Sequence, residues 1–298
     1  MIEIDLLRHV SVEGKPALYG VSDVSPSSQD NNKLLTVLTA QQNSESRYDD
    51  IISSPLQRCH KIAKAFAQQH QLPLTVVNDF QEMNFGLYDG VPFDDIPFGD
   101  APFDDAPFSD APSDSAPFGD ASSDNVPFDE AAKSKKQRAD KITESKLHWR
   151  CLERFFEQPA HITLPEAESL SDFHIRIIQA WQTLVNQQLA ITQKQVAEAA
   201  ASSTTLKPKR ILLITHGGVI RMILAHILQL DWQQGAWHQN LKVDYASLSR
   251  VAISQYCVNK SEANLQQVNS VQDIAQPAIF QQVKTIAMPF LKEQPNEG

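Results

Sequence analysis

Cysteine is scarce in this chain, and none of the usual cysteine motifs is present. The 298 residues include only Cys59, Cys151 and Cys257, an odd number at wide spacing and without a Cys-x-x-Cys pair. Disulfide frameworks and cysteine zinc sites use closely spaced, paired cysteines, so this usage indicates a reducing compartment.

Long apolar runs are also missing. No uninterrupted stretch reaches the roughly 20 residues that a membrane-spanning helix needs. The first residues, Met-Ile-Glu-Ile-Asp, lack the basic start and the apolar centre of a signal peptide. We therefore expect a soluble, cytoplasmic protein without a membrane partner.

Positive charge is absent from one long segment. Residues 91–130 hold eleven Asp and Glu and no Lys or Arg, so this segment carries a charge of −11. Because the whole chain sums to −10, the remaining residues together carry +1. The folded part is therefore expected to be nearly neutral, which is compatible with a locally basic pocket. No basic stripe with interleaved aromatic residues occurs, so we expect no nucleic-acid partner.

The same segment is a five-residue repeat. Units such as PFDDI, PFGDA and PFDDA follow one another from residue 92 to residue 130. A proline at nearly every fifth position prevents a continuous helix, neighbouring acids repel one another, and five residues are too few for a solenoid unit. We predict that residues 91–140 form a disordered insertion. The Pro-Phe pairs are interpreted either as docking motifs or, more simply, as a repeat expansion tolerated in a surface loop.

Elsewhere, short apolar runs alternate with helical stripes. A strand is predicted in each of five segments: residues 2–7, 48–53, 72–77, 210–215 and 247–256. Pro55 is expected in the first turn of a helix that continues to Ala67, and a second helix is expected through residues 220–227. Strands that alternate with helices predict an α/β three-layer sandwich, in which helices cover both faces of a mostly parallel central sheet.

A single domain is predicted from residues 1–90 and 141–256, interrupted by the acidic insertion. Within it, the polar stretch at residues 193–209 is expected to be a helix end followed by a loose connection. Beyond Tyr256 the sequence becomes rich in Gln and Asn. We treat residues 257–298 as a C-terminal extension without an assigned role, with a short helix expected near residues 279–286.

Two of the predicted strands end in a histidine. Arg8 and His9 follow the first apolar run, and His216 follows the run that ends at Thr215. Ligands of open α/β sheets bind at the carboxyl ends of the strands, so both imidazoles are expected at one edge of the sheet. Two imidazoles beside an arginine suit a phosphoryl group, whose transfer requires a nucleophile and stabilising positive charge.

With two further motifs, these residues resemble the histidine phosphatase superfamily, the phosphoglycerate-mutase-like proteins. The resemblance rests on four blocks in the family's order: Leu7–His9, Ser53–Cys59, Glu82–Gly90 and Thr215–Gly218. Each block alone has an ordinary explanation, such as an incidental Arg-His pair, a helix cap or a surface arginine. All four in order make a specific signal, which spans about residues 2–256.

The reaction implied by the resemblance proceeds through a phosphohistidine. His9 would be the nucleophile that attacks phosphorus, and neighbouring cations would favour its neutral form. Glu82 would protonate the leaving alkoxide and then activate the water that hydrolyses the phosphohistidine. The implied enzyme is a phosphoric monoester hydrolase, and its partner is a small-molecule phosphate monoester.

The resemblance also implies a cationic phosphate site. Arg8 and Arg58 would hold the phosphoryl oxygens, because the planar guanidinium matches phosphate geometry. His216 would add a donor, aided by backbone N–H groups at the start of the following helix, Gly217 among them. Cys59 is expected to be a packed residue that its helix turns away from Arg58. No carboxylate–histidine arrangement has metal-ligand spacing, so neither a metal nor another cofactor is expected.

Within the superfamily, the chain is most similar to the α-ribazole phosphatases of cobalamin nucleotide-loop assembly. The similarity lies in four segments: residues 8–12, 18–24, 82–86 and 168–169. It implies hydrolysis of α-ribazole 5′-phosphate, or of the adenosylcobalamin 5′-phosphate analogue. It also implies substrate contacts from Ser11, Tyr19 and Ser22, since residues 18–24 would form a loop at the rim of the pocket.

Three alternatives to this function were considered. The first is a broad-specificity small-molecule phosphatase or a phosphoprotein phosphatase of the same superfamily. The second, a phosphoglycerate mutase, would need a basic lid, whereas the lid region here opens with acids. The third, a non-catalytic phosphate-binding module, would have lost at least one of the four residues His9, Arg58, Glu82 and His216. The sequence does not indicate the oligomeric state.

Overall fold

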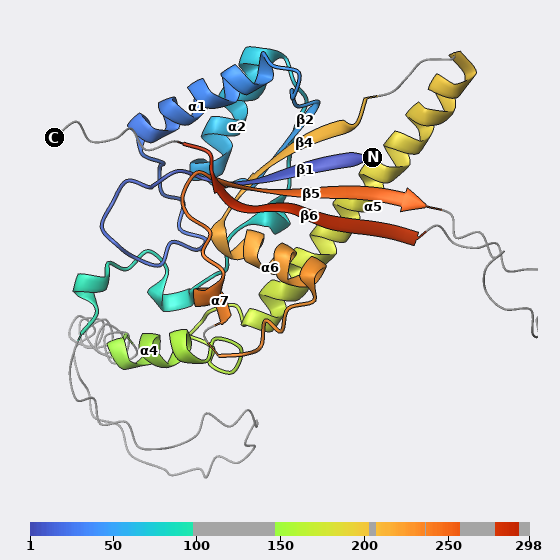
Figure 1. Cartoon of the computed structure of the whole chain (residues 1–298). Coiled ribbons are helices and arrows are strands. Elements are labelled where there is room, and N and C mark those ends of the chain that lie inside the picture. Colours follow the sequence, from blue (N-terminus) through green and yellow to red (C-terminus); the bar gives the residue numbers. More distant parts are fainter. Residues whose placement is uncertain (98–146, 203–206, 236, 257–277, 292–298) are drawn as a thin grey trace, which may run out of the picture.

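Six strands form one sheet in the computed structural model (Figure 1). The structure describes residues 1–97, 147–202, 207–235, 237–256 and 278–291. The strands lie in the order β3-β2-β4-β1-β5-β6. Their bounds are: β1 (Ile2–Arg8), β2 (Asp50–Ser53), β3 (Leu74–Val76), β4 (Lys209–Thr215), β5 (Ser247–Tyr256) and β6 (Ala278–Pro289). The first four are parallel to one another, whereas β5 is antiparallel to both of its neighbours, β1 and β6.

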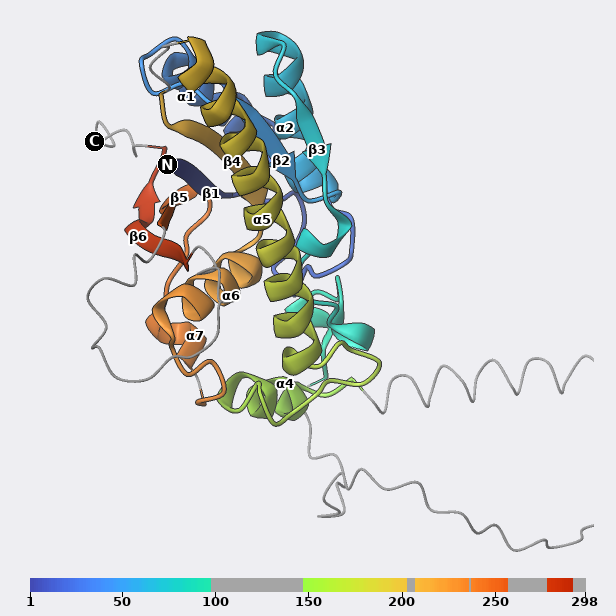
Figure 2. The same cartoon turned by 90° about the vertical axis from the view of Figure 1, so that its right-hand side faces the viewer.

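Helices cover both faces of this sheet, as predicted. Helices α1 (Ser28–Gln42) and α2 (Gln57–His70) pack on one face. The long α5 (Leu170–Ser202) and α6 (Gly217–Leu228) pack on the other, and α4 (Trp149–Glu157) and α7 (Trp237–Asn240) lie near their lower ends in Figure 2. Among the described helices, none is long and apolar enough to cross a membrane.

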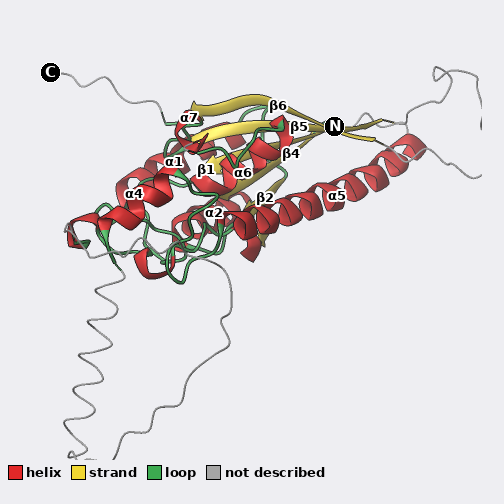
Figure 3. Cartoon of the chain, turned by 90° about the horizontal axis from the view of Figure 1, so that it is seen from below, coloured by secondary structure: helices red, strands yellow, loops and turns green. Residues whose placement is uncertain are grey.

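Alternation along β1 divides the hydrophobic core in two. Ile4 and Leu6 are fully buried on the face that packs against Trp181 of α5. Leu7 points to the opposite face and shares a second cluster with Phe66 of α2. Successive side chains of a strand point to opposite faces, so a central strand that is buried on both faces reads as a continuous apolar run. Figure 3 shows the resulting strand layer with α5 running beside it.

Most of the predicted elements are present, with shifted ends. Strand β5 has the predicted bounds, β1, β2 and β4 differ by one or two residues, and β3 is shorter than predicted. Pro55 lies before α2 rather than in its first turn, since the helix begins at Gln57. Helix α1 was not predicted; its start is marked by Ser27, whose hydroxyl accepts a hydrogen bond from the Asp30 N–H at 3.4 Å.

The helix expected near residues 279–286 is wrong, because this segment belongs to strand β6. It pairs with β5 from the Ser247–Pro289 pair to the Tyr256–Ala278 pair. Val283 and Ala287 of β6 pack against the core, and Gln281 accepts a hydrogen bond from the Trp181 indole at 2.8 Å. Pairing and burial of alternate side chains therefore outweigh local helix propensity here, and the sheet extends beyond residue 256.

The first residues of the predicted insertion are packed against the domain. Ile96 is 2% exposed and lies in the core. The Phe93 N–H donates to the carbonyl of Pro16 at 2.9 Å, and the Trp149 N–H donates to the carbonyl of Pro97 at 3.2 Å. The predicted start of the insertion at residue 91 is therefore too early. The remainder of the predicted insertion, residues 98–140, lies outside the described residues.

Candidate active site

The carboxyl ends of β1 and β4 bring the two predicted histidines together. Arg8 lies opposite Thr215 in the parallel register, and the backbone N–H of His9 donates to the carbonyl of Thr215 at 3.0 Å. The rings of His9 and His216 lie edge to face, with their centroids 5.2 Å apart. Both imidazoles are buried.

The hydrogen bond of His9 determines which ring nitrogen can act as a nucleophile. Its Nδ1 atom lies 2.6 Å from the carbonyl oxygen of Val10. A carbonyl oxygen can only accept, so Nδ1 carries the proton and Nε2 keeps its lone pair. Burial lowers the pKa of His9 well below its usual value, and the charges of Arg58 and Arg8 lower it further. His9 is therefore neutral at pH 7, with an unprotonated Nε2.

His216 is held by hydrogen bonds at both ring nitrogens. Arg58 donates its Nε–H to Nδ1 at 3.2 Å, and Nε2 lies 2.7 Å from the Ser54 hydroxyl. Because arginine is only a donor, Nδ1 must accept, and the ring proton sits on Nε2 and points to Ser54. Burial, followed by the charge of Arg58, lowers the pKa of His216 well below its usual value.

Cys59 packs against the same histidine. Its Sγ atom lies 3.6 Å from Nε2 of His216, and the side chain is fully buried. Burial raises the pKa of this thiol, which keeps it protonated. Cys59 is therefore a packed residue, as expected. The reason given for that expectation is wrong, because α2 places Arg58 and Cys59 together against His216 rather than turning one away.

Most hydrogen-bond donors of Arg58 are directed at the protein. Nη1 donates to the carbonyl of Ser22 at 2.8 Å, while Nη2 donates to the carbonyls of Tyr19 at 3.0 Å and Gly20 at 2.6 Å. With the bond to His216, four of the five N–H groups of a guanidinium have protein acceptors. Arg58 is 1% exposed, and its hydrogen bonds connect the loop at residues 19–22, the rim loop, to His216.

The rim loop is in turn held by Asp89. The Asp89 carboxylate accepts the backbone N–H groups of Gly20, Val21 and Ser22 at 3.2, 2.8 and 2.9 Å. A Cβ atom on Gly20 would lie 2.0 Å from the carbonyl oxygen of Met83, so only glycine fits this close approach.

Two of the three side chains predicted to contact substrate from this loop and its surroundings have protein partners. The Tyr19 hydroxyl donates to the carbonyl of Lys15 at 2.6 Å, and the Ser11 hydroxyl donates to Asp30 at 2.7 Å. Ser22 reaches the site through its backbone carbonyl, which binds Arg58. The hydrogen bonds described for these three residues are therefore made with other parts of the protein and do not indicate a substrate contact.

Arg8 lies beneath a loop that the sequence analysis missed. Its Nη1 donates to the carbonyl of Val243 at 2.5 Å, and its guanidinium lies 3.9 Å from the ring centroid of Tyr245. The Tyr245 ring, 47% exposed, also lies 5.5 Å from the His9 ring. A topological signal was available. The first residues of an antiparallel neighbour lie at the carboxyl end of β1, and Tyr245 lies two residues before the start of β5. A Cβ atom on Gly217 would lie 3.3 Å from Arg8, which places the start of α6 against the guanidinium.

Glu82 is fixed at the amino end of α6. One carboxylate oxygen accepts the backbone N–H of Gly218 at 3.0 Å, and the other accepts the N–H of Met83 at 3.2 Å. A Cβ atom on Gly218 would lie 2.2 Å from a carboxylate oxygen of Glu82, so a larger residue at this position would displace the carboxylate. Gly217 was predicted as a site residue, whereas Gly218 was not, because its contact depends on a residue more than a hundred positions away.

The structure therefore assembles the predicted core of the site. It comprises His9, Arg8, Arg58, His216, Gly217 and Glu82. The described part of the chain contains no group of three or more His, Cys, Asp or Glu that could hold a metal ion.

The chain is similar to known proteins both in sequence and in fold. The family model of the histidine phosphatase superfamily (branch 1) matches residues 6–126 and 128–265. No curated protein matches the chain. Among solved structures, the α-ribazole phosphatase from Shigella flexneri is 14% identical, with a TM-score of 0.53, over 85% of this chain and 91% of that one. Bacillus stearothermophilus YhfR is 13% identical, with a TM-score of 0.54, over 85% and 92%.

A third solved structure is phosphoserine phosphatase from Entamoeba histolytica in complex with 3-phosphoglyceric acid. It is 14% identical, with a TM-score of 0.50, over 85% of this chain and 91% of that one. At these identities, the structural likenesses establish the fold. The family model covers most of the chain and contains all four sequence blocks. The chain therefore belongs to the histidine phosphatase superfamily, and its enzyme class is that of a phosphatase.

Proposed function

We propose that this phosphatase hydrolyses phosphate monoesters through a phosphohistidine on Nε2 of His9. The observation that carries the proposal is the hydrogen bond from Nδ1 of His9 to the carbonyl of Val10, at 2.6 Å. It leaves the Nε2 lone pair available in a buried site beside two guanidinium groups, which lower the pKa of the ring. A neutral imidazole can attack phosphorus without first losing a proton.

In the first step, Nε2 of His9 attacks phosphorus in line as the bond to the leaving oxygen breaks. Arg8 supports this step because its Nε is buried and has no hydrogen-bond partner among the described residues, so this N–H can bind a phosphoryl oxygen. Arg58 keeps one N–H for the same purpose. Glu82 delivers a proton to the leaving oxygen, which becomes the alcohol.

In the second step, water attacks the phosphohistidine and the N–P bond breaks. Glu82 takes one proton from the water, inorganic phosphate is released, and His9 returns to its neutral form with the Nε2 lone pair restored. The proposed role of His216 differs from the expectation of a direct phosphoryl contact. Its Nε2 proton points to Ser54, so we assign to it the orientation of Arg58, whose Nε–H it accepts.

The proposed substrate is α-ribazole 5′-phosphate or the adenosylcobalamin 5′-phosphate analogue. The similarity of residues 18–24 to the α-ribazole phosphatase pattern supports it. The half-exposed Tyr245 ring beside His9 offers a planar surface on which an aromatic leaving group could stack. A broad-specificity or phosphoprotein phosphatase is the alternative outcome of the test below.

Turnover of four phosphate esters by the purified protein tests the proposal. The substrates are α-ribazole 5′-phosphate, 3-phosphoglycerate, p-nitrophenyl phosphate and a phosphoserine peptide. We expect the highest kcat/KM for α-ribazole 5′-phosphate and none for His9→Ala, with His161→Ala as the matched control at an exposed histidine. A preference for the peptide would replace the proposed substrate. Equal rates for wild type and His9→Ala would overturn the catalytic assignment.

A further inference from the structure

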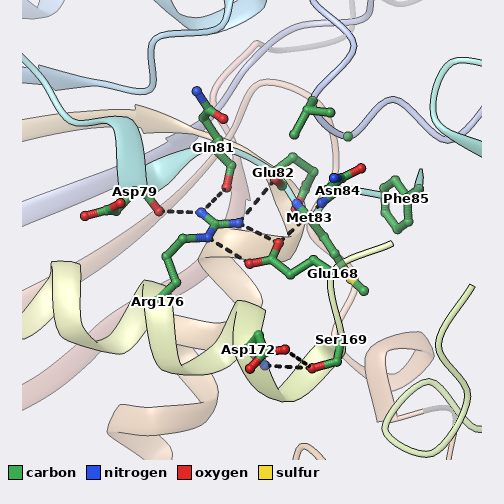
Figure 4. A network of polar contacts seen from close by, with 12 residues as sticks. Asp79, Gln81, Glu82, Met83, Asn84, Phe85, Glu168, Ser169, Asp172 and Arg176 are labelled. Carbon is green, nitrogen blue, oxygen red and sulfur yellow. Dashed lines mark hydrogen bonds and ion pairs between the residues drawn. The ribbon is translucent and has the colours of Figure 1, made fainter. Parts of the chain in front are cut away.

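Arg176 and Glu168 form a two-bond ion pair behind the segment that carries Glu82. Nε of Arg176 donates to one carboxylate oxygen of Glu168 at 2.9 Å, and Nη2 donates to the other at 2.8 Å (Figure 4). Both side chains are largely shielded from water, at 25% and 17% exposure. A paired, partly buried geometry of this kind is more directional than a typical surface ion pair.

The remaining donors of Arg176 hold the backbone on the amino side of Glu82. Nη1 donates to the carbonyls of Asp79 at 2.7 Å and Gln81 at 3.2 Å, and Nη2 approaches the carbonyl of Glu82 itself at 3.4 Å. Figure 4 shows these carbonyls converging on one guanidinium. Arg176 thus fixes the main chain up to and including Glu82.

Glu168 holds the backbone on the other side of Glu82. Its carboxylate accepts the N–H of Asn84 at 3.3 Å, and its own N–H donates to the carbonyl of Asn84 at 3.0 Å. The two residues of the ion pair therefore hydrogen-bond the backbone at both ends of the segment 81–84. The backbone that carries Arg176 is itself well anchored, because Arg176 lies on α5 next to the fully buried Ile177 and beside the ring of Phe173.

This placement matters because, within the described ranges of the chain, the Glu82 carboxylate makes two hydrogen bonds, both with backbone N–H groups. Proton transfer requires the carboxyl group within hydrogen-bond reach of the leaving oxygen, and a shift of about 1 Å can reduce the rate roughly a hundredfold. The position of the carboxyl group therefore depends on its main chain as well as on the Gly218 N–H, and Arg176 and Glu168 hold that main chain.

We propose that the Glu168–Arg176 pair positions Glu82 for proton transfer to the leaving group. Both are positioning residues, and the inference rests on the role of Glu82 in the proposed function. Lysine cannot replace Arg176, because a single ammonium cannot hold two carboxylate oxygens and the backbone carbonyls at once.

The dependence on leaving group tests this inference. We compare kcat/KM for 3-phosphoglycerate, whose alkoxide needs a proton, and p-nitrophenyl phosphate, whose phenolate leaves without one. Because kcat/KM reports phosphoryl transfer to His9, the later hydrolysis does not enter. Arg176→Gln and Glu168→Gln are expected to lower the value for 3-phosphoglycerate about 10- to 100-fold and that for p-nitrophenyl phosphate less than about threefold. Arg150→Gln, at an exposed arginine, is the matched control and should change neither.

A double variant separates positioning from general destabilisation. In a Glu82→Gln background, Arg176→Gln should cause little further loss on 3-phosphoglycerate, because the group it positions is already absent. Fully multiplicative losses, or equal losses on both esters, would overturn the inference. If Glu82→Gln itself leaves the ratio of the two esters unchanged, the proposed role of Glu82 fails. If only Arg176→Gln and Glu168→Gln leave it unchanged, the positioning inference fails alone.

Discussion

The Nε–H of Arg58 donates to Nδ1 of His216 at 3.2 Å, and this bond fixes the tautomer of the histidine. The proton on Nε2 then faces Ser54, and the rest of the guanidinium ties down the rim loop at residues 19–22. A buried arginine thus connects the second histidine, the rim loop and the phosphate site. Its planar shape is as important to this arrangement as its charge.

Replacement of Arg58 by lysine is expected to keep the charge but lose this connection. One ammonium cannot reach His216 and three carbonyls together, so we predict a loss in kcat/KM on the order of a hundredfold and weaker inhibition by inorganic phosphate. Lys61→Ala, at an exposed position on the same helix, serves as control. Activity of Arg58→Lys within threefold of wild type would show that charge alone suffices.

Acid should destabilise the fold through His9 and His216. Burial lowers the pKa of both below the usual value, so in the unfolded chain they gain protons near pH 6.5 that the folded protein does not bind. The unfolded state then binds more protons, and the free energy of unfolding falls as pH decreases below about 6.5, by up to about 1.4 kcal/mol per pH unit for each histidine. Urea denaturation between pH 5 and pH 8 measures this dependence.

The matched comparison for that pH dependence is His9→Gln against His161→Gln. The first variant removes one buried imidazole and should flatten the dependence, whereas the second changes an exposed residue and should not. The same slope in wild type and His9→Gln would contradict the account of His9 as a buried, neutral ring.

Asp5 lies in the middle of strand β1. Its carboxylate, 1% exposed, accepts from Arg250 at 2.6 and 2.9 Å, from Tyr48 at 2.8 Å and from Arg210 at 3.2 Å. Asp5→Asn removes the carboxylate that pairs with Arg250 and leaves Arg210 with its second partner, Glu3, and it is expected to cost about 3 to 5 kcal/mol in the free energy of unfolding. Asp95→Asn breaks an ion pair whose side chains are 58% and 61% exposed, and it should leave stability unchanged. Equal denaturation midpoints for the two variants would refute this prediction.

The part of the acidic repeat that follows Pro97 is predicted to be dispensable for activity and for stability. Deletion of residues 98–130 should leave kcat and the thermal midpoint unchanged, since residues 131–146 remain to connect Pro97 with residue 147. Deletion of residues 92–130 also removes Ile96 from the core and should cost about 2 to 5 kcal/mol. Thermal unfolding and turnover of the two deletion variants measure the difference; a loss of activity in the shorter deletion would show that the repeat contributes to the reaction.

The sequence was sufficient to predict that His9 and His216 lie close together, and physical reasons explain this. Apolar runs before His9 and His216 predict buried strands, and parallel strands bring their carboxyl ends to one edge. The partners of Arg58 in the rim loop could not be predicted in this way, because they are backbone carbonyls that any residue supplies. Strand β6 was missed because its glutamines obscure the alternation of apolar and polar residues. Its pairing partner β5 is also separated from it in the sequence by residues 257–277. The Glu168–Arg176 pair was not predictable either, because Glu168 precedes α5 and the spacing of the two residues is not that of a helix-face pair.

The central claim is that Nε2 of His9 carries the phosphoryl group. Rapid quenching of the enzyme with a radiolabelled phosphate ester, followed by peptide mapping at alkaline pH, tests it most directly. We predict label on the peptide that contains His9, sensitive to acid as a phosphoramidate is, and absent from His9→Gln. Label on another residue, or undiminished turnover without any enzyme-bound phosphate, would contradict the account.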